Sequence, residues 1–219
     1  MKKRSTFLEL KESEREYRRK IILEAAVSLF SSHSFYEIGM RDIAEEAGIS
    51  PASIYRYFSS RDHILAEILA IEAMEAKKRQ FNRVKGKKAS LEEIARGIVD
   101  FFLERESTLQ MIGHFLLNRD LDPEARERFL KIQHQYMEEF NRLLIQGGLV
   151  KEKADIFSRT FFGSLLGLII SQKARRGEDR TRKEIHHMAK MTAHLFQGYI
   201  QGQGKKMENR SAPEGADQV

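Results

Sequence analysis

The sequence predicts an all-α fold of about nine helices, and three observations support this prediction. Apolar residues recur at helical spacing in nearly every segment of the 219-residue chain. No segment alternates between apolar and polar residues with a period of two, and no hairpin dipeptide separates two strand-like runs. Two of the three prolines, Pro51 and Pro123, directly follow a capping residue, where a helix tolerates proline because the missing N–H would be unpaired anyway.

The first helix is predicted from an apolar stripe that starts at Tyr17 and continues through Ile21, Ala25 and Leu29. The segment before it, residues 1–12, opens with Lys2-Lys3-Arg4, and we expect it to be a flexible basic N-terminus. The first folded domain is therefore placed at residues 13–60.

Residues 40–58 combine two short predicted helices with a tight turn between them. The first helix ends at Ala47, and Gly48 suits the left-handed conformation that closes a helix. Ser50 caps a second helix, residues 51–57. An apolar wedge is supplied by Ile43, Ile49, Ile54 and Phe58. This pattern is typical of a helix-turn-helix, which binds DNA.

The second short helix is about 10 Å long by its rise per residue, and it fits a DNA major groove about 12 Å wide. Small residues at its start allow a close approach, and its N-terminal N–H groups favour phosphate. An ordinary corner between two surface helices is the alternative, but it does not explain the exposed tyrosines and arginine. The predicted DNA-binding residues are Arg41, Ser50, Pro51, Ala52, Ser53, Tyr55, Arg56, Tyr57 and Arg61.

Further helices are predicted at 90–105, 107–118, 123–146, 152–175 and 181–202. Ser90 and Glu93 match a capping box at the start of the first of these. Residues 205–219 are polar and lack apolar periodicity, so we expect a disordered tail.

A dimer interface is predicted on the last two helices. Gly163 and Gly167 are four residues apart and share one face without side chains, which permits close helix contact. The alternative is a glycine notch for packing within one chain. The predicted dimer residues are Gly163, Leu166, Gly167, Ile170, Met191 and Leu195. Because one recognition helix reads only a few base pairs, we expect two heads related by two-fold symmetry and an operator that is an inverted repeat.

The composition of the chain excludes several classes of function. The formal net charge of +6 is compatible with a polyanionic partner, although residues 1–62 hold 11 basic and 10 acidic side chains. The chain has no cysteine, which excludes a disulfide framework and a thiolate metal site. No signal peptide or membrane-spanning stretch is visible, so we expect a cytoplasmic protein without a membrane partner. No catalytic or metal-binding motif is found, and we predict no enzyme, no cofactor and no metal site.

The N-terminal segment resembles the TetR family of transcriptional regulators over about residues 17–68. The matching residues include Ile21 to Ala26, Leu29-Phe30, Met40 to Ala44, Ala47 to Ser50, and Ile54 to Phe58. The resemblance implies a three-helix DNA-binding domain, a fourth helix at about 61–83 that links it to the body, and a helical domain at 61–204 for ligand binding and dimerisation. Arg61 replaces the family's common lysine and keeps its charge for a phosphate.

The resemblance also implies a pocket for a small ligand in the helical domain. Candidate lining residues are aromatic or otherwise apolar, which favours a mostly apolar ligand: Phe101, Phe102, Met111, Phe115, Tyr136, Met137, Phe140, Phe161 and Leu165. The expected function is a repressor released from its operator by that ligand. The alternatives are a constitutive or architectural DNA-binding dimer without a ligand, and an enzyme on a helical scaffold.

Overall fold

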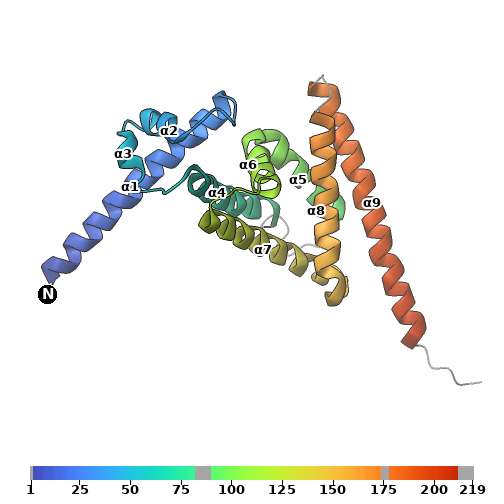
Figure 1. The fold of residues 1–219 in the computed structure, drawn as a ribbon. Coiled ribbons are helices and arrows are strands. Elements are labelled where there is room, and N and C mark those ends of the chain that lie inside the picture. Colours follow the sequence, from blue (N-terminus) through green and yellow to red (C-terminus); the bar gives the residue numbers. More distant parts are fainter. Residues whose placement is uncertain (1, 82–89, 174–177, 212–219) are drawn as a thin grey trace, which may run out of the picture. The chain divides into compact units, whose positions relative to one another are not determined.

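The computed structural model describes residues 2–81, 90–173 and 178–211, and for the side chains it describes 7–79, 90–172 and 182–202. Within these residues all regular structure is helical, as the sequence predicts, and nine helices follow one another along the chain (Figure 1). Their bounds are α1 (Lys2–Ser32), α2 (Met40–Glu46), α3 (Pro51–Ile54), α4 (Arg61–Phe81), α5 (Leu91–Glu104), α6 (Glu106–Leu117), α7 (Pro123–Gln146), α8 (Lys151–Lys173) and α9 (Glu178–Ser211).

Both ends of the chain are more helical than the sequence suggests. We expected a flexible segment at 1–12, but α1 begins at Lys2. No glycine or proline interrupts this stretch, and ion pairs such as Arg18–Glu14 support it one helical turn apart. The predicted tail at 205–219 is likewise helical as far as Ser211, and residues 212–219 lie outside the described residues.

The chain divides into two compact units at other places than the predicted boundary at 60/61. The first unit, here called the head, holds residues 1–74 and 105–132, and the second, the body, holds 75–104 and 133–219. The division differs from the predicted boundary because α6 and the start of α7 contribute Met111, Phe115 and Phe129 to the core of the DNA-binding segment. Tertiary packing of this kind leaves no local signal in the sequence.

The core of the head is built where α1, α2, α3 and α4 direct their apolar sides toward one another. Its fully buried side chains include Ile22, Phe35, Ile43, Ile54 and Leu65. Phe115 stacks on Phe129 with ring centroids 4.8 Å apart, which adds an aromatic pair to this core. The predicted wedge is confirmed for Ile43, Ile54 and Phe58, which are buried, whereas Ile49 is half-buried at its edge.

The body packs α5 against α9 and α8, and α8 against α9. At the start of α5, the amide of Glu93 donates to the Ser90 hydroxyl at 3.2 Å and the amide of Ser90 donates to the Glu93 carboxylate at 3.1 Å. These two bonds are the predicted capping box. They place the apolar side of α5, including Ile94, Ile98 and Phe102, in the core of the body.

One described helical stretch, Lys151–Gln172 in α8, is long and apolar enough by length and composition to cross a membrane, and 39% of that stretch is buried. The sequence analysis expected no stretch long enough to span a membrane because it considered only runs without any charged residue. Because one side of α8 packs on α5 and α9, part of its apolar character serves the core of the body.

Candidate nucleic-acid interface

The turn between α2 and α3 has the geometry that the sequence predicts. Gly48 adopts a φ of +66°, in the left-handed region that a residue with a Cβ rarely enters. The amide of Gly48 donates to the Glu45 carbonyl, and the amide of Ile49 donates to the Ala44 carbonyl. These two bonds close α2 in a Schellman motif and turn the chain into α3.

The recognition segment, residues 50–58, begins with a side-chain cap. The Ser50 hydroxyl accepts from the Ser53 amide at 3.1 Å, and Pro51 occupies the first helical position. The α-helix is shorter than the predicted 51–57, because it ends at Ile54. Beyond that point, the amide of Arg56 donates to the Ser53 carbonyl and the amide of Tyr57 donates to the Ile54 carbonyl. These bonds span three residues instead of four, so the chain continues as a tighter helical turn.

The recognition segment presents one face to solvent and one to the head. Ile54 and Phe58 are buried, while Pro51, Ala52 and Arg56 are exposed. Tyr55 is 56% exposed, a high value for an aromatic side chain in a packed head. Ser53 and Tyr57 are half-buried, and Arg41 of α2 is exposed. The predicted DNA-binding residues of α2 and of the recognition segment are therefore exposed, apart from the partly covered Ser53 and Tyr57.

Arg61, the last predicted DNA-binding residue, packs against the loop that follows α1. Its guanidinium donates to the Phe35 carbonyl and lies over the Phe35 ring, 4.6 Å from the centroid. Its Nε is buried without a hydrogen-bond partner among the described residues. Burial lowers the pKa of Arg61 from its usual value, although the nearby Asp62 opposes this change. The half-buried side chain is thus held against the loop after α1, which it stabilises.

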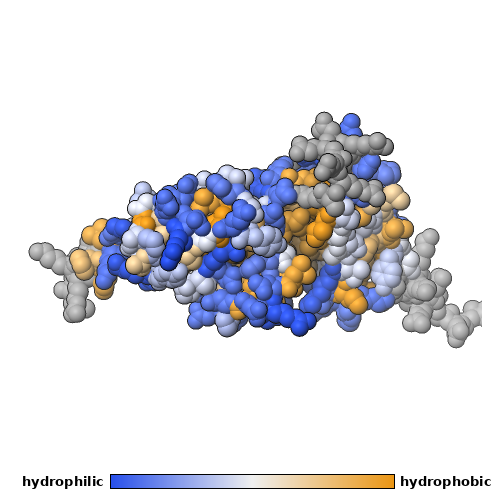
Figure 2. Space-filling model, turned by 45° about the horizontal axis from the view of Figure 1, so that its top comes forward, coloured by the Kyte–Doolittle hydropathy of each residue, from blue (hydrophilic) through white to orange (hydrophobic). Residues whose placement is uncertain are grey.

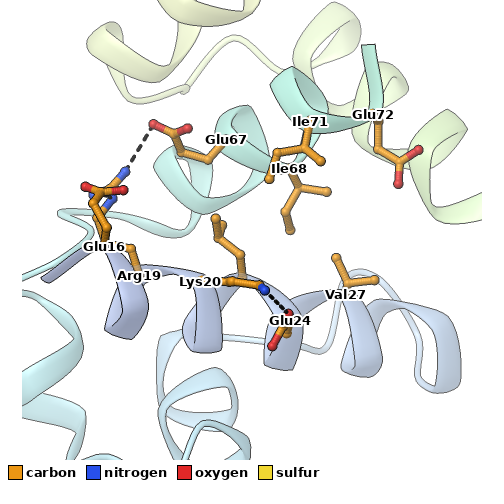
Figure 3. A pocket seen from close by; sticks show the side chains of 10 residues that line it. Glu16, Arg19, Lys20, Glu24, Val27, Glu67, Ile68, Ile71 and Glu72 are labelled. Atoms are coloured by element: carbon orange, nitrogen blue, oxygen red, sulfur yellow. Dashed lines mark hydrogen bonds and ion pairs between the residues drawn. The ribbon is translucent and has the colours of Figure 1, made fainter. Parts of the chain in front are cut away.

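Arg19 is a residue that the sequence analysis missed. It donates to the Tyr57 carbonyl at 2.7 Å and to the Glu67 carboxylate of α4 at 3.2 Å, and it lies over the Phe58 ring. Figure 3 shows this bond to Glu67 across a groove of about 550 Å³ between α1 and α4. The end of the recognition segment is therefore anchored to two helices. No local motif marks such an arginine, because its partners lie 38 and 48 residues away.

The predicted pocket residues fall into both units. Met111 and Phe115 are buried in the core of the head, so the structure does not bring them into the body with the others. Within the body, Phe102 and Tyr136 each contact Phe162, and Phe140 contacts Phe161 at a centroid distance of 5.7 Å. Phe101, Met137 and Leu165 are also buried. These aromatic rings, which contact one another in two groups, Phe101–Phe102–Phe162–Tyr136 and Phe140–Phe161, are here called the aromatic cluster of the body.

The predicted dimer residues lie on an exposed surface of the body. A Cβ added at Gly163 or Gly167 would meet no other atom within 4 Å in the described chain, so nothing in it supports the alternative of a notch for packing within the chain. Ile170, Met191 and Leu195 are exposed, Leu195 to 75%, and Leu166 is half-buried. Hydrophobic residues accordingly reach the surface over α8 and α9 (Figure 2).

These features define a class of protein. A capped short helix follows a glycine turn, its inner face is buried, and its outer face carries tyrosine and arginine; this is a helix-turn-helix DNA-binding protein. Residues 22–68 match the sequence model of the bacterial regulatory proteins of the tetR family. The chain belongs to the TetR family of transcriptional regulators.

Known relatives agree with this assignment. The chain is 26% identical over 140 residues to the fatty acid metabolism regulator protein of Bacillus subtilis, covering 62% of this chain and 72% of the relative. It is 38% identical over 64 residues to the HTH-type transcriptional repressor KstR of Rhodococcus jostii, covering 29% of this chain and 30% of the relative. The fold is similar to that of the transcriptional regulator FadR from Bacillus subtilis in complex with stearoyl-CoA, with a TM-score of 0.59 and 17% identity over 81% of this chain and 96% of that one.

Proposed function

We propose that the protein is a homodimeric, cytoplasmic repressor that binds an inverted-repeat operator and leaves it when a small, mostly apolar ligand binds the body. The observation that carries the DNA-binding part is the recognition segment, whose Tyr55 and Arg56 face solvent while Ile54 and Phe58 are buried. An arginine on such a surface suits guanine, with which it forms two hydrogen bonds, and a tyrosine hydroxyl suits a phosphate.

The dimer is supported by the unpartnered apolar surface of α8 and α9. Ile170 is exposed on α8, where two glycines leave room for a second helix, and Met191 and Leu195 are exposed on α9, which packs against α8. Removing such side chains from water stabilises an interface by roughly 25 cal/mol per Å² of apolar area. A second copy of the same surface satisfies two-fold symmetry.

A long-chain acyl-CoA is the first ligand to test, because one relative is named for fatty acid metabolism and a protein of similar fold was crystallised with stearoyl-CoA. The aromatic cluster of the body offers an apolar environment for an acyl chain. Its rings contact one another, however, so a ligand has to separate them, for example Phe140 from Phe161.

The same close packing favours the second candidate function, a DNA-binding dimer that takes no ligand. Adding stearoyl-CoA to the protein–DNA complex distinguishes the two. A ligand-responsive repressor loses DNA affinity and gains thermal stability, since a ligand that binds only the folded state raises the midpoint. Free coenzyme A is the control for the headgroup. Unchanged DNA affinity and unfolding midpoint across a series of acyl chains support the candidate without a ligand.

A further inference from the structure

The first turns of α1 carry positive charge on the side that faces the head. Lys11, Arg15 and Arg18 follow one another at spacings of four and three residues, so they share one face of the helix. Four residues further on, the same face carries Ile22, which is buried in the head. The basic stripe, defined as Lys11, Arg15 and Arg18, thus continues the core-facing side of α1 beyond the core.

Acidic residues in this stretch are mostly kept on another face. Glu9, Glu12 and Glu16 recur at spacings of three and four residues and lie about a quarter turn or more from the middle of the basic stripe, by the helical rotation of about 100° per residue. Arg18 pairs with Glu14 at 2.9 Å. Lys11 and Arg15 are exposed and make no hydrogen bond or ion pair with any described residue. The near-neutral charge of residues 1–62 therefore conceals a local cationic surface.

The basic stripe starts where α1 contacts the recognition segment. Arg19, the neighbour of Arg18, donates to the carbonyl of Tyr57 at 2.7 Å. From there the stripe extends about 10 Å toward the N-terminus by the rise per residue, and this part of α1 runs clear of α2 and α3 (Figure 1). A duplex that meets Tyr55 and Arg56 has this cationic face beside it.

We propose that the basic stripe binds the DNA phosphate backbone next to the groove that the recognition segment enters, so that the DNA interface includes the N-terminal turns of α1. This inference rests on the proposed DNA-binding function. The occupant is a duplex because the stripe is cationic, because its Lys11 and Arg15 pair with no described residue, and because it adjoins the recognition segment. Its contacts carry no sequence information and strengthen binding to every duplex.

The test uses the full-length protein and duplexes that the wild type selects from a random-sequence pool. Affinity for a selected duplex and for an unrelated duplex is measured over a range of salt concentrations. Each lost phosphate contact flattens the plot of log affinity against log salt by about 0.9. K11Q/R15Q removes two contacts from each of the two heads of a dimer, so the slope of this plot should flatten by about 3.6. The variant should lower affinity for both duplexes by the same factor and leave thermal unfolding unchanged. K11R/R15K should retain the wild-type slope.

The matched control is K131Q/K183Q, which removes the same charge from exposed positions on α7 and α9. An equal flattening in the control, or a wild-type slope in K11Q/R15Q, overturns the role of the basic stripe while the DNA-binding function stands. If the wild type selects no duplex at all, the proposed function itself fails.

Discussion

Tyr55 and Arg56 are the recognition-segment side chains whose removal should affect DNA most and the fold least. Both are exposed, so Arg56→Ala and Tyr55→Phe should leave the unfolding midpoint nearly unchanged. Loss of a base contact by Arg56→Ala should weaken operator binding by about 1–3 kcal/mol and relax specificity at one position. Mobility-shift titrations measure this, with the exposed Arg119→Ala as control. Full operator affinity in both variants would show that the recognition segment is placed wrongly.

Replacement of Arg61 should affect the stability of the fold more than DNA binding. The Arg61→Ala substitution removes the bond to the Phe35 carbonyl and the contact with the Phe35 ring. We expect the free energy of unfolding to fall by about 1–3 kcal/mol, whereas the salt dependence of DNA binding by the folded protein stays as in the wild type. Chemical denaturation and salt titrations separate the two effects. A flatter salt dependence with unchanged stability would restore the role of Arg61 as a phosphate contact.

At the scale of the helices, the sequence predicts the caps and the turn between α2 and α3. Capping at Ser50 and Ser90 and the turn at Gly48 depend on residues within one turn of one another, so the sequence contains them. The half-buried position of Arg61 and the anchoring role of Arg19 depend on contacts with distant segments. The same reason explains why Met111 and Phe115 were assigned to a pocket instead of the head.

The turn between α2 and α3 gives a prediction at this scale. A Cβ added at Gly48 meets no atom within 4 Å in the described chain. The free-energy cost of a side chain there therefore comes only from the positive φ of the backbone. Gly48→Ala should lower the free energy of unfolding by about 1–2 kcal/mol, and Gly48→Asn by less, since asparagine tolerates this conformation better. Thermal or urea unfolding measures both variants. Equal stability of Gly48→Ala and the wild type would mean that the turn has another conformation.

For the whole molecule, the proposed dimer interface on α8 and α9 would bring two heads to one operator. Leu195→Arg places a charge on the proposed interface without disturbing the core of the body, because Leu195 is 75% exposed. We expect monomers in light scattering and a large loss of operator affinity although the head is untouched. Gly167→Leu should act in the same way by separating the paired helices.

The control for the dimer is Leu117→Arg, which changes an exposed leucine of the head in the same way. It should leave the mass in solution unchanged. A normal dimer with wild-type DNA binding in both Leu195→Arg and Gly167→Leu would locate the interface elsewhere.

The most direct test of a dimeric helix-turn-helix regulator is the sequence of the DNA that it selects. Purified protein is incubated with a random-sequence duplex pool, and bound duplexes are amplified and sequenced over several rounds. We predict an inverted repeat whose half-sites are centred about one helical turn, or a multiple of it, apart. Arg56→Ala should lose preference at the same position in each half-site. Enrichment of a single unrepeated site, or no enrichment at all, would contradict the account.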